Sequence, residues 1–201
     1  MSRTHLAFVS CCLMLAPGAV LAHSPIKDIG NFYGGLLHPL FIPAHALLLG
    51  ALGLLLGQQQ PAENKFPLLL FVVCAVAGLA LSGHTNGVAL QTAQLLGTAA
   101  IGLLVAIQPA IPVFLRTAGS AFCALVIGID SGQAELASAA LFASLVGTWL
   151  GMCILLLCTM GAADYLKEKP WQTIGVRIIG SWMTASALLV LSLSVSSLQT
   201  R

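Results

Sequence analysis

The chain has 201 residues, of which 58% are hydrophobic and only 7% are charged, and its formal net charge is +2. Soluble domains carry about 25% charged residues, so this composition excludes a soluble protein. The small net charge and the lack of a basic cluster argue against nucleic acid as a partner, and no Walker-type phosphate loop is present to bind ATP.

The first 22 residues predict a cleaved signal peptide. Arg3 and His5 form a positive start, residues 6–15 form an apolar core, and the segment ends in Val20-Leu21-Ala22. Small residues at the first and third positions before the cut suit signal peptidase. The alternative is an uncleaved first helix, but an apolar core of about ten residues is short for spanning a bilayer. Cleavage leaves His23 as the mature N-terminus and residues 23–201 as one membrane domain.

Six apolar segments follow, each close to the length that crosses the hydrocarbon core of a bilayer. They cover residues 34–57, 66–82, 88–107, 111–129, 136–161 and 174–195. In lipid every backbone donor must be paired within its own segment, so these segments must be helices. The sequence therefore predicts an all-α, polytopic membrane bundle with about six transmembrane helices, embedded in the lipid bilayer.

The basic residues predict the orientation of this bundle. With the mature N-terminus outside, the predicted inner loops and helix ends carry Lys65, Arg116, Lys167, Lys169 and Arg177, and the outer side carries Lys27 and Arg201. This bias agrees with the positive-inside rule. We therefore expect a bacterial inner-membrane protein whose mature N- and C-termini are both periplasmic.

Small residues recur in the predicted spans and form two GxxxG pairs, Gly53 with Gly57 and Gly147 with Gly151. Such pairs let helix backbones approach closely. They predict a closely packed bundle and leave a homo-oligomer open, but they carry no information about a substrate.

Histidines are the candidate ligands of a metal site. His23, His38, His45 and His84 all lie on the predicted outer side or in the outer half of the membrane, and Asp130 ends the fourth span on that side. Histidines near the headgroups can simply satisfy local hydrogen bonds, and His84 in its turn fits that interpretation equally well. Within a span, ionisable residues are costly and usually mark a pathway or a site, which favours a role for His38 and His45.

The seven-residue spacing of His38 and His45 leaves two alternatives. In an unbroken helix the two residues share a face but lie about 10.5 Å apart, too far to bind one ion together. Pro39 and Pro43 disturb a helix in this region. Either the helix is broken and the gap is shortened, or the two histidines serve successive positions on a path.

The ligand types limit the choice of metal. Imidazole suits nickel, cobalt, copper and zinc, and a histidine-rich site with one carboxylate argues against magnesium and calcium. The chain has no Met-x-x-Met pattern, which makes a route for copper(I) less favoured.

The stretch from Gly34 to Leu48, with His38-Pro39 followed by Ala44-His45, resembles the first-helix signature of the HupE/UreJ membrane proteins. Ala22-His23 resembles the end of their signal peptides, and Arg177 with Gly180 resembles the start of their last helix. This resemblance implies six spans and a nickel or cobalt permease associated with hydrogenase, urease or cobalamin metabolism.

The chain departs from the family pattern at two places. Ala44 stands where the family usually has an aspartate before the second histidine. The later histidine-glycine motif appears as Ile127-Gly128-Ile129-Asp130-Ser131-Gly132, without histidine. The resemblance therefore carries over His38 and His45, and it carries over Asp130 only by position.

These observations predict a secondary permease that admits Ni²⁺ or Co²⁺ from the periplasm, with no prosthetic group and no catalytic step, and therefore not an enzyme. The ion would be captured near His23 and His84 and passed to His38 and His45, with Gln91 and Gln94 as polar lining. One alternative is a membrane accessory protein that binds a metal or a partner for metalloenzyme maturation without transporting it. Another is an intramembrane enzyme, for which the sequence offers no convincing nucleophile and base.

Overall fold

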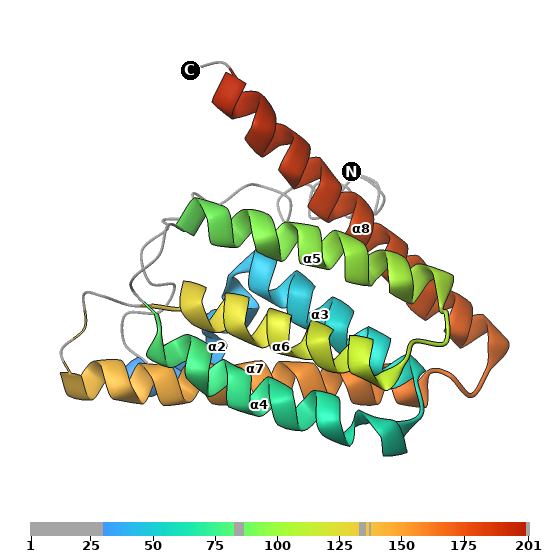
Figure 1. Ribbon diagram of the computed structural model, residues 1–201, viewed down its shortest axis with the longest axis horizontal. Helices are drawn as coiled ribbons and strands as arrows, with labels where there is room; N and C mark the ends of the chain where they lie inside the picture. The colour runs from blue at the N-terminus through green and yellow to red at the C-terminus, as the bar shows by residue number, and fades with distance from the viewer. Residues whose placement is uncertain (1–29, 83–86, 133–135, 137, 200–201) are drawn as a thin grey trace, which may run out of the picture.

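A computed structural model describes residues 30–82, 87–132, 136 and 138–199 of the chain (Figure 1). This part is helical and contains no strand. Its elements are α2 (Asn31–Phe41), α3 (Pro43–Gln58), a 3₁₀ turn (Pro61–Asn64), α4 (Lys65–Ala80), α5 (Gly87–Ile107), α6 (Val113–Asp130), α7 (Ser138–Tyr165) and α8 (Pro170–Gln199). The predicted signal peptide lies outside the described residues and stays a prediction.

The predicted all-α membrane bundle is confirmed. Five helices are long and apolar enough to cross a membrane, and the pair α2–α3 makes a sixth span if the two are counted together. The span that contains this pair is not a continuous helix, since α2 and α3 meet at an angle of 71°. The first predicted segment is therefore a broken helix.

The local sequence at residues 42 and 43 suits the break. Ile42 has an extended backbone, with φ −91° and ψ 109°, and Pro43 is the first residue of α3. Proline disfavours the helical conformation of the residue that precedes it and has no N–H to continue the helical hydrogen bonds. It is also well suited to the first position of a new helix. Pro43 thus ends one helix and begins the next.

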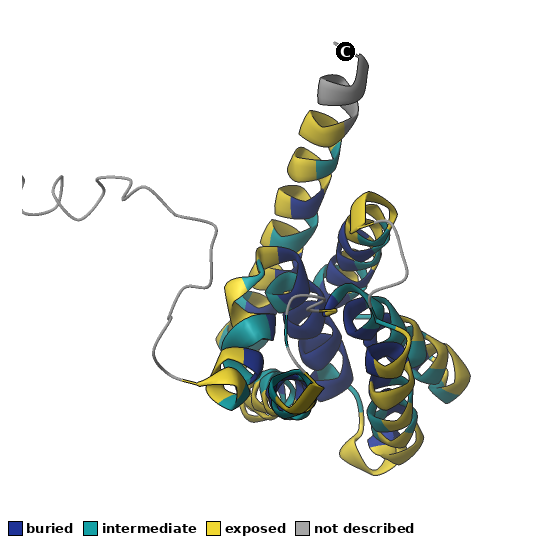
Figure 2. Ribbon diagram, turned by 90° about the vertical axis from the view of Figure 1, so that its left-hand side faces the viewer, coloured by how far each residue is buried: buried dark blue, intermediate teal, exposed yellow. Residues whose placement is uncertain are grey.

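Helix α3 is the centre of the bundle. Twelve of its 16 residues are buried, on all sides of the helix, as expected for a helix surrounded by others. It packs against α7 and α5, and the strongest remaining pairings are α4 with α6, α2 with α7 and α5 with α8. Figure 2 shows buried residues on the inward faces and exposed residues on the outward faces of the helices. The outward faces carry large apolar side chains such as Phe66, Phe142 and Trp182, which suits contact with lipid.

Both predicted GxxxG pairs lie where helices touch α7. A Cβ atom at Gly147 or Gly151 of α7 would overlap the backbone of α2, and one at Gly57 of α3 would overlap the backbone of α7. On α2, a Cβ at Gly35 would overlap the Ser144 carbonyl of α7. Backbones this close leave no room for any side chain, so glycine at these positions fixes the short helix α2 against α7.

Successive helices from α3 to α8 alternate in direction, and the charges are divided between the two ends of the bundle. The C-terminus of α3 and the N-termini of α4, α6 and α8 share one end, which we call the arginine end. It holds every Lys and Arg of the described residues, namely Lys65, Arg116, Lys167, Lys169 and Arg177. The opposite end, which we call the histidine end, holds the α2–α3 break, the start of α5 and Asp130 at the end of α6.

We expect Gly151→Val to destabilise the protein, because the new side chain would overlap the Leu36 carbonyl of α2 and displace that helix. Forcing extra carbons into a packed interface costs about 1–3 kcal/mol. Gly161→Val in the same helix is the matched control, because nothing lies within 4 Å of a Cβ there. Thermal unfolding of the purified proteins in detergent should show a lower midpoint for Gly151→Val alone; equal midpoints would contradict this packing.

Candidate metal centre

The break between α2 and α3 brings two histidines together. The ring centroids of His38 and His45 are 5.6 Å apart, with the ring planes at 62°. An unbroken helix would have held the two residues about 10.5 Å apart along its axis. Of the two alternatives that the sequence left open, the structure has the broken helix and the shortened gap.

Two further helices add a carboxylate and an amide to this pair. His45 Nε2 lies 3.0 Å from Oδ2 of Asp130, at the end of α6. Gln94 of α5 donates from its Nε2 to the same oxygen, at 2.8 Å. We call His38, His45, Gln94 and Asp130 the histidine cluster. His45 and Gln94 have no exposed surface, whereas the side chain of Asp130 keeps 21% exposure.

The hydrogen bond to Asp130 assigns the protons of His45. A carboxylate only accepts, so Nε2 of His45 must carry the proton and donate it, and Nδ1 of a neutral ring is then left with a free lone pair. A histidine that binds a metal commonly donates its other N–H to a carboxylate in the same manner. Asp130 therefore orients the His45 ring so that Nδ1 is the available donor atom.

Three atoms of the cluster are buried without any hydrogen-bond partner, namely His38 Nε2, His45 Nδ1 and Gln94 Oε1. An unpaired buried polar atom costs about 1–3 kcal/mol, so such atoms are uncommon and need an explanation. His45 Nδ1 and Gln94 Oε1 have free lone pairs, and His38 Nε2 has one when the proton of its ring is on Nδ1. Imidazole nitrogens are ligands that nickel, cobalt, copper and zinc accept. A borderline divalent transition metal fits this donor chemistry.

The cluster is not a closed coordination sphere as it stands. Within the described ranges, no group of three or more His, Cys, Asp and Glu side chains is arranged to hold an ion. Oδ2 of Asp130 accepts from both His45 and Gln94. The arrangement is a pair of imidazoles that a carboxylate orients, with an amide beside it.

The structure places only part of the predicted site. His38, His45 and Asp130 meet, but His23 and His84 lie outside the described residues and their roles stay predictions. Gln91 is exposed, so it does not line the cluster as expected, and Gln94 alone contributes. None of the cysteines in the described residues forms a disulfide.

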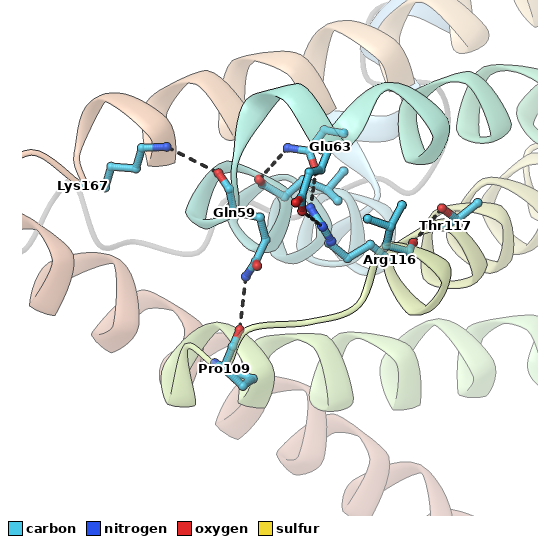
Figure 3. Close-up of polar contacts among 9 residues, drawn as sticks. Gln59, Glu63, Pro109, Arg116, Thr117 and Lys167 are labelled. Carbon is cyan, nitrogen blue, oxygen red and sulfur yellow. Dashed lines mark hydrogen bonds and ion pairs between the residues drawn. The ribbon is translucent and has the colours of Figure 1, made fainter.

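A second polar group, at the arginine end, was not predicted as a group (Figure 3). Arg116, which is 2% exposed, forms an ion pair with Glu63 and donates from Nη1 to Oδ1 of Asn64 at 2.9 Å. Asn64 donates in turn to the Leu56 carbonyl at 2.8 Å. From the sequence, Arg116 counted only as a basic residue near a helix end. Arg116 is the fourth residue of an apolar helix, and a charged residue at such a position indicates a buried polar partner. No other feature of the sequence indicated this group.

The fold and the cluster together define a multi-pass membrane protein with two imidazoles, one buried and one partly buried, at the break between α2 and α3. The chain belongs to the HupE/UreJ family, because the family model described as "HupE / UreJ protein" matches residues 11–190. This match confirms the resemblance seen in the sequence. The family is linked to nickel and cobalt transport and to urease and hydrogenase maturation. Neither the curated proteins nor the solved structures contain a match to the chain.

We expect Asp130→Ala to lower the stability of the protein, because it leaves His45 Nε2 and Gln94 Nε2 buried without an acceptor. The cost of such unpaired groups is about 1–3 kcal/mol. Asp130→Asn keeps an acceptor oxygen and should cost less. Asp164→Ala is the control, because it removes a carboxylate from an exposed ion pair with Lys167 and should cost under about 1 kcal/mol. Thermal unfolding without added metal measures the effects; an unchanged midpoint for Asp130→Ala would count against the hydrogen bonds described.

Proposed function

We propose that the protein is a secondary permease that carries Ni²⁺ or Co²⁺ across the bacterial inner membrane into the cell. The observation that carries this proposal is the set of three buried atoms without a hydrogen-bond partner in the histidine cluster, which lies beside the break between α2 and α3. Lone pairs that have no hydrogen-bond donor in the protein are available to an ion. The link of the family to nickel and cobalt supports the choice among the metals that imidazole accepts.

A broken span provides what an ion site inside a membrane needs. Irregular backbone at membrane depth is tolerated where it lines a cavity or is covered by protein, and transporters commonly place substrate sites at broken helices. Here the break turns one histidine from each half-helix toward the other. The site therefore depends on the break itself and not only on the presence of two histidines.

The charge distribution supports the direction of transport. We assign the histidine end to the periplasm and the arginine end to the cytoplasm, because the basic residues of the described part gather at the arginine end. Both mature termini are then periplasmic, and His23 and His84 would lie on the side from which the ion arrives. A membrane potential favours the inward movement of a dication by about 4.6 kcal/mol per 100 mV, so no ATP-binding element is required.

Asp130 contributes charge as well as orientation. A dication between two neutral imidazoles keeps its full charge in a region of low dielectric, which is costly without a nearby counter-charge. The Asp130 carboxylate reaches the His45 ring directly and supplies that negative charge. This carboxylate would take the place of the aspartate that the family usually has at the position of Ala44.

A protein that binds metal without transporting it remains the second candidate. It is favoured by the lack of a closed ligand group in the described residues and by the link of the family to urease and hydrogenase maturation. The two functions differ in one measurable respect, since a permease moves metal into cells or vesicles and an accessory protein only binds it.

The proposed orientation predicts where reporter fusions are active. A reporter joined after Arg201 should be active in the periplasm, and one in the loop of residues 166–169 should be active in the cytoplasm, because an even number of spans separates the mature termini. N-terminal sequencing of the purified protein should begin at His23. Cytoplasmic activity at Arg201 would show that the number of spans or the signal peptide is wrong.

Uptake of radioactive nickel or cobalt by intact cells tests the metal path. His45→Ala should abolish uptake at low external metal and His38→Ala should act similarly, because each removes one of the two imidazole donors. His84→Ala should mainly raise the concentration for half-maximal uptake. Each variant needs an unchanged amount of protein in the membrane, measured by immunoblot.

Nickel binding by the purified variants, measured by equilibrium dialysis, separates the two candidate functions. The permease predicts that binding and uptake are both lost in His38→Ala/His45→Ala. Binding by the wild-type protein with no uptake above background would favour the accessory protein. Wild-type uptake in the double variant would eliminate the permease mechanism proposed here.

A further inference from the structure

A cavity of about 400 Å³ lies at the arginine end, between α3, α5 and α6. Leu52 of α3, Ile101 of α5 and Gly119 of α6 line its walls, and the α5–α6 connection, residues 109–112, lies along it. Arg116 also contributes to the lining. The cavity is separate from the histidine cluster, and the transport mechanism above does not use it.

The cavity and the histidine cluster share the same three helices. Leu52 follows His45 by seven residues on α3, and Ile101 follows Gln94 by seven residues on α5. Two helical turns therefore separate the cluster from the cavity on both helices, a distance of about 10.5 Å. Along α6, the inward face runs from Asp130 through Ile127 and Ser120 to Arg116. The cavity lies on the continuation of the cluster toward the arginine end.

An apolar layer fills the interval between the two. Leu48 and Leu49 of α3 and Ile127 of α6 have no exposed surface and belong to one hydrophobic core. A dication cannot leave its ligands and cross such a layer without a very large desolvation cost. Channels and transporters close their paths with apolar constrictions of this kind. In this conformation the layer therefore closes the route from the cluster to the cavity.

One buried hydroxyl of α6 lies next in the chain to a cavity-lining residue. Ser120, which has no exposed surface, follows the cavity-lining Gly119, and its Oγ has no hydrogen-bond partner. The usual partner of such an atom is an internal water, provided that there is room for one.

Hydrogen bonds at the arginine end hold the rim of the cavity. Gln59, just after α3, donates to the carbonyl of Pro109 in the connection at 3.2 Å, and Gln58 donates to the Val105 carbonyl of α5 at 3.1 Å (Figure 3 shows the first). The ion pair of Arg116 with Glu63 joins the start of α6 to the turn before α4.

We propose that this cavity is the cytoplasmic vestibule of the permeation path, closed from the histidine cluster by the apolar layer. The inference rests on the proposed permease function and extends it to the exit route of the ion. The ion would reach the vestibule when the layer opens and would leave past the rim held by Gln58, Gln59 and Arg116. A vestibule open to the cytoplasm contains water, whereas a cavity open to the bilayer would hold an acyl chain, and this difference can be tested.

The test measures the reaction of thiols placed in the cavity. Gly119→Cys is suitable because a Cβ at this position meets nothing within 4 Å. The matched control is Gly161→Cys on α7, where the space is equally open and the residue is exposed outside the cavity. Gly161 lies four residues from the end of its helix and Gly119 six residues from the start of α6. Distance from the cytoplasmic end of the helix alone would therefore favour reaction of the thiol at position 161.

Both variants are made in a protein whose native cysteines are replaced by alanine. Inside-out membrane vesicles that contain each variant are treated with a charged, membrane-impermeant maleimide, which reaches the protein from its cytoplasmic side. Gly119→Cys should react at least about tenfold faster than Gly161→Cys, and Leu104→Cys, at a second lining position, should react as Gly119→Cys does. Equal slow reaction of all three, with rapid reaction only toward a lipid-soluble maleimide, would show an acyl-chain cavity and overturn the proposal.

Filling the cavity separates this proposal from the permease function on which it rests. Gly119→Leu should reduce nickel uptake at least about tenfold while nickel binding by the purified protein stays unchanged, and Gly161→Leu should alter neither. Rapid reaction of the thiol at position 119, together with no metal uptake by the wild-type protein, would support a water-filled cavity and contradict the permease function. Wild-type uptake in Gly119→Leu would reject the vestibule and leave the permease intact.

Discussion

The proline at the start of α3 is the constraint on which the rest of the structure depends. Pro43 keeps Ile42 extended, the extended residue turns the chain by 71°, and the turn brings His38 to within 5.6 Å of His45, measured between ring centroids. A continuous helix would have separated the same side chains by two turns. The break is stable because glycines on α2 and α7 allow the short helix to lie directly on its neighbour. The backbone break at Pro43 thus determines where the two histidines can meet.

Much of the fold follows from the sequence, because the bilayer restricts the possibilities. A segment of about twenty apolar residues has to be a helix, and the basic residues gather at one end of the bundle as predicted. The course of the first span was less predictable. Pro39 and Pro43 both disturb a helix, yet Pro39 lies inside α2 and only Pro43 accompanies the break. Tertiary packing decides which proline acts, and that packing cannot be read from local sequence.

The histidines of the site could be predicted from the sequence, but the arrangement of the residues around them could not. A histidine in a span is costly enough to be noticed, which identified His38 and His45. The contacts of Asp130 with residues 85 and 36 positions away depend on how α3, α5 and α6 are arranged, and no local pattern encodes that arrangement. For the same reason Gln94 and Gln91 looked equivalent in the sequence, although only Gln94 faces the cluster. The buried pairing of Arg116 with Glu63 likewise joins segments that only the folded bundle brings together.

The pairings of the helices divide the histidine cluster between two halves of the molecule. Both imidazoles belong to α2 and α3, which pack on α7, whereas the carboxylate and the amide belong to α6 and α5, whose main partners are α4 and α8. The hydrogen bond between Asp130 and His45 crosses the boundary between these halves, whereas the one from Gln94 stays within its half. Any sliding of one half against the other would therefore withdraw the counter-charge from the imidazoles and weaken their hold on a cation. If the cluster binds a cation as proposed, a change in helix packing at this boundary would also lower its affinity for that cation.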